Sequence, residues 1–160
     1  MDFHEKQSFW NWLLVILMMI LFISTLDFDW EAVLKGNLKE ISINPSFWII
    51  LTITVLFSLV RLRTTIDRNG ITVQFFPFLL KSKLIKWSEL EQIYVKNYNP
   101  IADYGGWGYR NGGEGKAYNT KGNQGLQLIF KDGSRLLIGT QKKKELGSIV
   151  NKVNQEIFLK

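Results

Sequence analysis

The sequence predicts a membrane α-helical hairpin followed by an α+β domain, a seven-stranded antiparallel open barrel capped by a C-terminal helix. Three observations predict this class: two long apolar blocks near the N-terminus, alternating apolar and polar residues after them, and helical apolar spacing in the last segment. We therefore expect residues 1–62 of the 160 to form an N-terminal tail and two transmembrane helices, and residues 63–160 to form the second domain.

The two apolar blocks predict the transmembrane hairpin. A helix of about 20 mostly apolar residues crosses a hydrocarbon core of about 30 Å, and Phe9 to Phe28 has this length and an uncharged centre, LLVILMMILFI. The second block, 46–62, is shorter and has Arg61 near its end. Tryptophans at the block ends fit an aromatic belt, although buried core anchors are the alternative: Trp10, Trp12, Trp30 and Trp48. We expect helices at about 9–28 and 46–62.

The charges beside the blocks predict the orientation. The charged residues of the connector between them are mostly acidic, whereas three arginines lie at or after the end of the second block: Arg61, Arg63 and Arg68. The positive-inside rule therefore predicts a two-pass protein of the cytoplasmic (inner) membrane, with both termini cytoplasmic and an extracytoplasmic connector. Within that connector, Glu31 to Asn44 is expected to be a short loop, with a weakly amphipathic surface helix as the alternative.

Strand signals begin at Arg61. Ile71, Val73 and Phe75 alternate with polar residues, and the dipeptides Asn69-Gly70 and Asp132-Gly133 favour tight turns. Seven strands are predicted, at Arg61–Arg68, Ile71–Phe78, Lys81–Trp87, Ile93–Tyr98, Ala117–Thr120, Gly125–Phe130 and Arg135–Gly139. Thr140 is a candidate N-cap for a helix from about Gln141 to Phe158, whose apolar stripe would close the barrel.

Three segments of this domain resemble a known family: YGGWGYR at Tyr104–Arg110, KAYNTKGNQGLQLIF at Lys116–Phe130, and DGSRLLIGTQ at Asp132–Gln141. They are similar to bacterial membrane-anchored proteins with a pleckstrin-homology-like (PH-like) domain after a two-helix hairpin. The resemblance covers about Arg61 to Val153. It implies a seven-stranded barrel with a C-terminal helix, and it implies neither catalytic residues nor the eukaryotic phosphoinositide specificity.

Composition excludes several kinds of chemistry. The chain has no cysteine and a single histidine, His4, so thiolate catalysis, cysteine zinc sites, a Ser-His-Asp triad and multi-histidine metal sites are not expected. The glycine-rich segment Asn99–Lys116 matches neither the Walker pattern nor the dinucleotide-binding pattern. We expect no catalytic residue, no metal and no cofactor.

Charge and aromatic residues select the candidate contacts. Residues 61–160 carry a net charge of +9, whereas residues 1–60 carry −3. Two lysine clusters and one aromatic segment could contact an anionic lipid or a partner: Lys81, Lys83 and Lys86; Lys142, Lys143 and Lys144; and Trp107, Tyr109 and Arg110. The alternative for the lysines is a solvated face. For the aromatic segment it is Trp107 packed in the barrel, with Arg110 paired to a local acid.

These features predict a non-catalytic integral membrane protein that presents a basic PH-like domain at the cytoplasmic membrane surface for anionic lipid or protein binding. The expected partners are the lipid bilayer, anionic phospholipid headgroups, and another membrane protein or a second copy of the chain. Nucleic acid is not expected, because no reading motif is present. One alternative is a structural or assembly subunit of a membrane protein complex. A less favoured alternative is an enzyme that uses scattered carboxylates such as Asp103 and Glu114.

Overall fold

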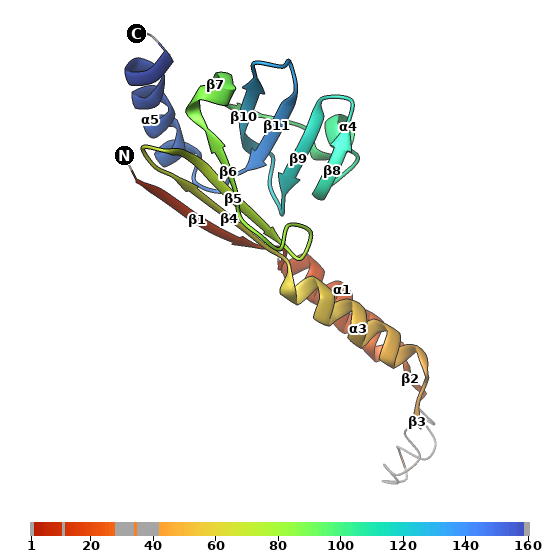
Figure 1. The fold of residues 1–160 in the computed structure, drawn as a ribbon. Helices are drawn as coiled ribbons and strands as arrows, with labels where there is room; N and C mark the ends of the chain where they lie inside the picture. The colour runs from red at the N-terminus through yellow and green to blue at the C-terminus, as the bar shows by residue number, and fades with distance from the viewer. Residues whose placement is uncertain (1, 11, 28–33, 35–41, 159–160) are drawn as a thin grey trace. The chain divides into compact units, whose positions relative to one another are not determined.

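The chain forms two compact units in a computed structural model that describes residues 2–10, 12–27, 34 and 42–158. Met1–Phe9 and Val60–Lys160 form the first, called the β unit here, and Trp10–Leu59 form the second, called the hairpin unit (Figure 1). The units divide the chain differently from the predicted domains 1–62 and 63–160, because the first nine residues belong with the C-terminal hundred.

A strand at the N-terminus explains this division. β1 (Phe3–Ser8) pairs antiparallel with β4 (Arg61–Ile66), from Phe3 opposite Ile66 to Ser8 opposite Arg61. Phe3, Glu5 and Gln7 are buried in alternation with exposed residues. The hairpin unit is therefore an insertion between two neighbouring strands of one sheet.

The first sheet has four strands in the order β1-β4-β5-β6. Its remaining members are β5 (Gly70–Phe76) and β6 (Lys83–Lys86). The turn between β4 and β5 depends on Gly70, which has φ 149°, a value that L side chains rarely adopt. A Cβ at this position would overlap the carbonyl oxygen of Ile85.

The second sheet has five strands in the order β7-β10-β11-β9-β8. They are β7 (Leu90–Asn97), β8 (Gly108–Gly112), β9 (Gly115–Asn119), β10 (Gln124–Phe130) and β11 (Arg135–Gly139). The β9 and β11 pair is parallel. A short helix, α4 (Pro100–Tyr104), precedes β8, and the Asn99 side chain caps it. The glycine-rich segment 99–116 is thus mostly regular structure.

One hydrophobic core joins both sheets and the C-terminal helix. It contains Leu62 and Phe75 from the first sheet and Ile93 and Leu128 from the second. α5 (Lys143–Val153) is followed by a π-helical turn, η3 (Asn154–Phe158). α5 buries Leu146, Val150 and Val153, as the predicted stripe requires. The first sheet is joined to β7 by a 3₁₀ turn, η2 (Trp87–Glu89).

The predicted fold class is nevertheless wrong. Strands lie at all seven predicted positions, but the described part of the β unit also contains β1 and β8, and its nine strands form two sheets of four and five. The parallel β9 and β11 pair is a second departure from an antiparallel barrel. The physical reason is that local alternation identifies a strand, whereas the partner of that strand is decided by contacts distant in sequence.

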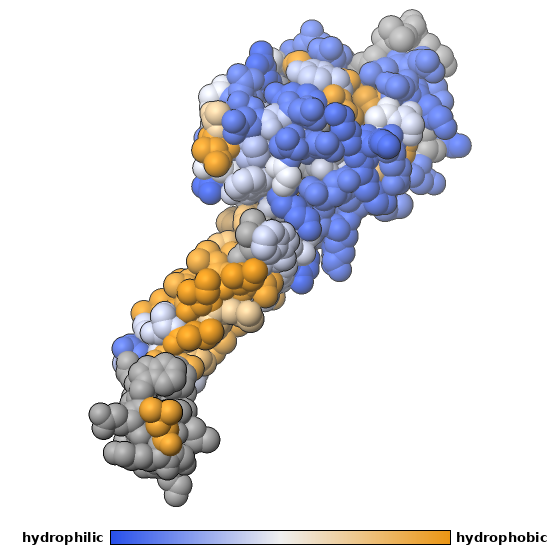
Figure 2. Space-filling model, turned by 180° about the vertical axis from the view of Figure 1, so that it is seen from behind, coloured by the Kyte–Doolittle hydropathy of each residue, from blue (hydrophilic) through white to orange (hydrophobic). Residues whose placement is uncertain are grey.

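The hairpin unit contains two helices, α1 (Trp12–Ile23) and α3 (Ser46–Leu59). Beyond them, β2 (Leu26–Asp27) pairs with β3 (Ser42–Ile43). The helices contact each other through an edge-to-face pair of Phe22 and Phe47. Most of their large apolar side chains remain exposed, and Figure 2 shows the resulting apolar surface over these helices.

The predicted transmembrane hairpin is also wrong. No helix among the described residues is both long and apolar enough to cross a membrane. At 1.5 Å per residue, α1 and α3 extend for only about 18 and 21 Å, short of a hydrocarbon core of about 30 Å. The spans 9–28 and 46–62 fail because each apolar block is longer than its helix: the chain turns after Ile23, and β4 begins at Arg61.

Several dependent predictions fail with it. The integral membrane protein, the multi-pass membrane class and the inner-membrane location with cytoplasmic termini all required helices that cross the bilayer. The predicted connector lies largely outside the described residues, as does Trp30.

Candidate functional site

The loop between β5 and β6 is fixed to the strand before it. The Leu79 N–H donates to the Phe75 carbonyl oxygen at 2.7 Å, and the Gln74 side-chain amide donates to the Leu80 carbonyl oxygen at 2.9 Å. Leu79 packs against the core. These contacts anchor Leu79 and Leu80 to the strand before them.

This fixed loop exposes apolar side chains beside lysines. Phe78 is 55% exposed and Leu80 is 69% exposed, and Lys81 of the loop and Lys83 at the start of β6 are also exposed. We call these four residues the loop tip. An exposed apolar patch with a polar rim is typical of an interaction surface, because water solvates large apolar side chains poorly.

Stacked aromatic rings support the loop tip. The Phe78 ring stacks on Tyr109 with centroids 6.0 Å apart, and Tyr109 stacks on Tyr118 with centroids 5.0 Å apart. Phe75 lies 5.3 Å from Phe78 and 6.1 Å from Tyr118. Burial, together with the hydrogen bond and charge interaction with Tyr109, raises the pKa of Tyr118 to about 12, so its phenol is neutral near pH 7.

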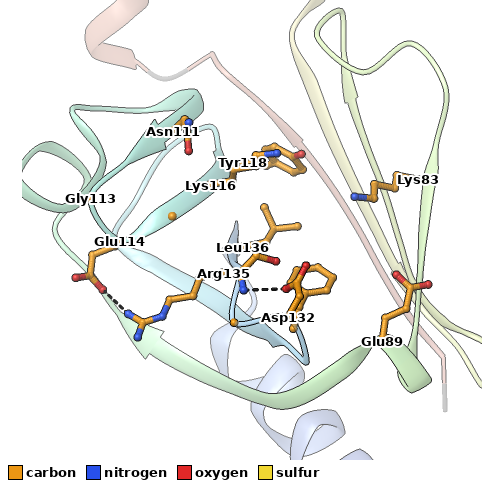
Figure 3. A pocket seen from close by; sticks show the side chains of 14 residues that line it. Lys83, Glu89, Asn111, Gly113, Glu114, Lys116, Tyr118, Asp132, Arg135 and Leu136 are labelled. Carbon is orange, nitrogen blue, oxygen red and sulfur yellow. Dashed lines mark hydrogen bonds and ion pairs between the residues drawn. The ribbon is translucent and has the colours of Figure 1, made fainter.

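A polar pocket of about 850 Å³ adjoins this stack (Figure 3). Tyr118 lines it and is buried, as is Leu136. Lys83 and Glu89 approach from β6 and η2, whereas the other charged side chains come from the second sheet and its turns (Figure 3): Glu114, Lys116, Asp132 and Arg135. The lining thus contains three cations and three carboxylates, and its net charge is zero.

Internal contacts engage only part of this charged lining. An Arg135 Nη1 atom lies 3.6 Å from Glu114 Oε2, longer than a charge-assisted hydrogen bond. Asp132 accepts a hydrogen bond from the Ser134 backbone N–H at 2.8 Å, and its hydrogen bonds with Ser134 hold its pKa below the usual value. Lys83 and Lys116 form no hydrogen bond or ion pair with any described residue. Their ammonium groups are therefore available to a ligand.

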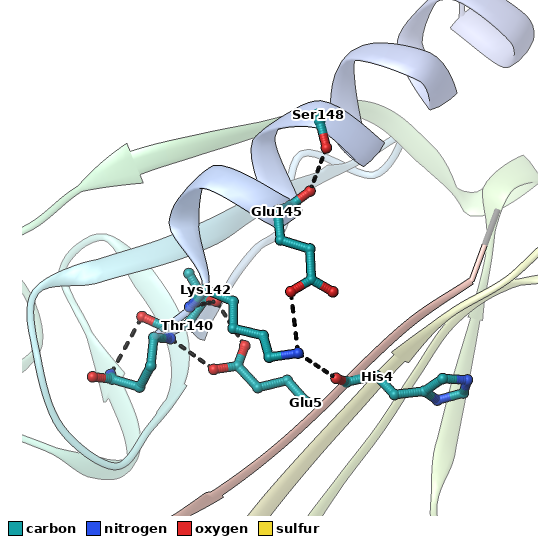
Figure 4. A network of polar contacts seen from close by, with 7 residues as sticks. His4, Glu5, Thr140, Lys142, Glu145 and Ser148 are labelled. Atoms are coloured by element: carbon teal, nitrogen blue, oxygen red, sulfur yellow. Dashed lines mark hydrogen bonds and ion pairs between the residues drawn. The ribbon is translucent and has the colours of Figure 1, made fainter.

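The second lysine cluster lies at the start of α5, around a cavity of about 440 Å³. Lys142 is engaged within the chain, because its Nζ lies 3.1 Å from Glu145 Oε2 and donates to the His4 carbonyl oxygen at 3.3 Å (Figure 4). Lys143 Nζ donates to Asn97 Oδ1 at 2.9 Å. Two of the three lysines are thus engaged within the chain, and only Lys144 is unpaired among the described residues.

Sequence reasoning missed a buried carboxylate beside this cluster. Glu5 of β1 is 8% exposed and accepts hydrogen bonds from the Thr140 hydroxyl at 2.6 Å and the Gln141 N–H at 2.7 Å (Figure 4). The Thr140 hydroxyl in turn accepts from the Lys142 N–H at 3.0 Å. The N-terminal strand is thereby tied to the residues that start α5.

The remaining candidates are Trp107, Tyr109, Arg110 and Lys86, and Arg110 pairs with a carbonyl oxygen and not with the expected acid. The Trp107 indole N–H donates to the Gly122 carbonyl oxygen at 2.8 Å, and Arg110 Nε donates to the Trp107 carbonyl oxygen at 3.0 Å. These contacts hold the segment together locally. Tyr109 belongs to the stack under the loop tip, and Lys86 is exposed on β6. The structure thus places Tyr109 against Phe78 of the loop that carries Lys81, with Lys83 at the start of β6, and leaves the lysines of α5 as a separate cluster.

No known protein family, curated protein or solved structure matches the chain. The resemblance to bacterial PH-like domains therefore stays a prediction.

Proposed function

We propose that the β unit is a non-catalytic module that binds the surface of an anionic phospholipid membrane through the loop tip. The observation that carries this proposal is that Phe78, Leu80 and Lys81 are exposed on one anchored loop, and that Lys83 is exposed where β6 begins after it. Surface binding of this kind is peripheral and requires no helix that crosses the bilayer.

The apolar side chains and the lysines of the loop tip are each suited to a different part of such a membrane. Apolar and aromatic side chains are stabilised when they leave water for the interfacial region. Lysines near an anionic surface contribute about 1 kcal/mol each. Because the loop is already ordered by its bonds to β5, little conformational entropy is lost on binding.

The net charge of the β unit supports the same partner. Residues 61–160 carry +9, and long-range attraction to an anionic surface depends on this total. The lysines of α5 would add to that attraction without direct contact. A protein partner would instead need a complementary acidic surface, and its binding would not follow the anionic lipid content of vesicles.

The test is vesicle binding by the full chain, with vesicles of phosphatidylcholine alone and of phosphatidylcholine mixed with phosphatidylglycerol. The quantity to measure is the ratio of the two partition coefficients, because contributions independent of lipid charge cancel in it. Replacing Lys81 and Lys83 by Gln should lower this ratio about 30-fold, the equivalent of about 2 kcal/mol.

A matched pair of substitutions controls for net charge. Arg68 is exposed in the turn at the opposite end of β5, and Lys152 is exposed on α5. Arg68→Gln with Lys152→Gln removes the same two charges and should change the ratio far less. An equal fall for both pairs would show that only the net charge attracts the protein to the membrane, and would reject the loop tip as the binding site. A ratio that neither pair changes would also reject the proposal.

A further inference from the structure

We propose that the polar pocket binds a small zwitterion that carries one phosphate and one ammonium group. This is the chemistry of a phosphatidylethanolamine headgroup and of free phosphoethanolamine. The inference rests on the proposed function, because the pocket adjoins the loop tip, and it adds the class of headgroup that the site takes.

The cations of the pocket provide the phosphate contacts. Lys83 and Lys116 are exposed, unpaired among the described residues, and come from different sheets. Arg135 pairs with Glu114 only at 3.6 Å, and both side chains are about half exposed, so an ion pair of this kind contributes little and can be exchanged for a ligand. Lys83 thus approaches the cavity from β6, and Lys116 and Arg135 line it from the second sheet (Figure 3).

The carboxylates of the pocket explain why a simple anion would be a poor ligand. Glu89, Glu114 and Asp132 balance the three cations, so an anion alone gains little from the total charge. A ligand with charges of both signs can pair with both kinds of side chain. Glu89 is suited to the ammonium group, since the one hydrogen bond of its carboxylate to a described residue is a long one, at 3.3 Å from the Lys86 N–H.

The position of the pocket connects this ligand to the membrane. Lys83 belongs to both the loop tip and the pocket lining. Tyr118 lines the pocket, and the stack through Tyr109 reaches Phe78. When the loop tip enters the headgroup layer, the pocket beside it is at the level of phosphate and ammonium groups. Its volume of about 850 Å³ accommodates a headgroup with bound water.

The test is calorimetric titration of the full chain, in a nonionic detergent, with phosphoethanolamine, inorganic phosphate and ethanolamine. We expect saturable binding of phosphoethanolamine and at least about tenfold weaker binding of the other two, the effect of losing one charge-assisted hydrogen bond. Lys116→Gln should weaken the binding of phosphoethanolamine. Glu89→Gln should abolish the preference for phosphoethanolamine over phosphate. Lys152→Gln, remote on α5, should change neither.

The outcomes separate this inference from the proposed function. Equal binding of phosphate and phosphoethanolamine, or no binding of either, would overturn the zwitterion site. The preference for anionic vesicles would be unaffected by that result. Competition by phosphatidylethanolamine in mixed detergent micelles against bound phosphoethanolamine would identify the lipid as the source of the headgroup. Binding of phosphoethanolamine that such micelles do not displace would show a site for the free compound, and would reject the membrane source.

Discussion

Replacing Glu5 by Ala should destabilise the β unit strongly, although Glu5 lies in a short segment at the very N-terminus. Its carboxylate is 8% exposed and accepts hydrogen bonds from the Thr140 hydroxyl and the Gln141 N–H. Both partners belong to the connection between β11 and α5, so the substitution removes two of the polar contacts that tie β1 to the opposite end of the chain.

The size of the effect follows from the kind of bond. Hydrogen bonds to a charged group contribute about 1.5–3 kcal/mol each, and relief of the burial cost of the carboxylate offsets part of this sum. We expect a fall of about 3 kcal/mol in the free energy of unfolding. Glu5→Gln should recover part of the loss, because its amide oxygen can still accept one of the two bonds.

The assay is urea unfolding of the full chain, monitored by hydrogen exchange. Only peptides from β4, β5 and β11 are read, so that the stability of the β unit alone is measured. Lys6→Ala is the matched control, since Lys6 is exposed on the same strand, and it should change stability by less than about 0.5 kcal/mol. A loss for Glu5→Ala as small as that of the control would refute the account of β1.

Two other predictions concern the division of the chain and the buried tyrosines. Replacing residues 10–59 by Asn-Gly should leave the β unit folded, because the ends of β1 and β4 are register partners and a two-residue turn can join them; loss of dispersed amide NMR signals would contradict this. Stability should also fall as the pH rises from about 10 to about 12, because burial raises the pKa of Tyr98, Tyr104 and Tyr118 to about 12, and the unfolded chain releases these protons first. Thermal unfolding across this pH range should show a shallower fall of stability for Tyr118→Phe than for the unchanged chain. The same pH dependence in both proteins would reject the raised pKa of Tyr118.

The strands could be predicted from sequence where their buried positions are apolar. Ile71, Val73 and Phe75 alternate with polar residues and belong to β5. β1 has the same alternation of burial, but two of its buried positions are Glu5 and Gln7. A search for alternating apolar residues therefore cannot find it, because its inward side chains are satisfied by hydrogen bonds and not by apolar packing.

The length of an apolar block proved a poor guide to the length of a helix. The first block continues past Ile23, where Ser24 and Thr25 bond to carbonyl oxygens of the last helical turn and Leu26 enters a strand. Hydropathy alone does not distinguish an apolar helical residue from an apolar strand or turn residue.

The candidate site was predictable only in part. Lys81 and Lys83 were found because a cluster of like charges is visible in sequence. The pocket charges were not identified as a group, since residues from 83 to 136 meet there only through the arrangement of two sheets. Glu114 was considered as an enzymatic carboxylate, but its visible partner is Arg135.

The most direct test of lipid binding by the loop tip is a fluorescent label at position 80. The chain has no cysteine, so Leu80→Cys and the control Asn151→Cys, exposed on α5, each accept one environment-sensitive dye. We predict a blue shift in emission for the label at position 80 when phosphatidylglycerol vesicles are added, and none for the label at position 151. No shift at position 80, or equal shifts at the two positions, would contradict the claim that the loop tip enters the membrane surface.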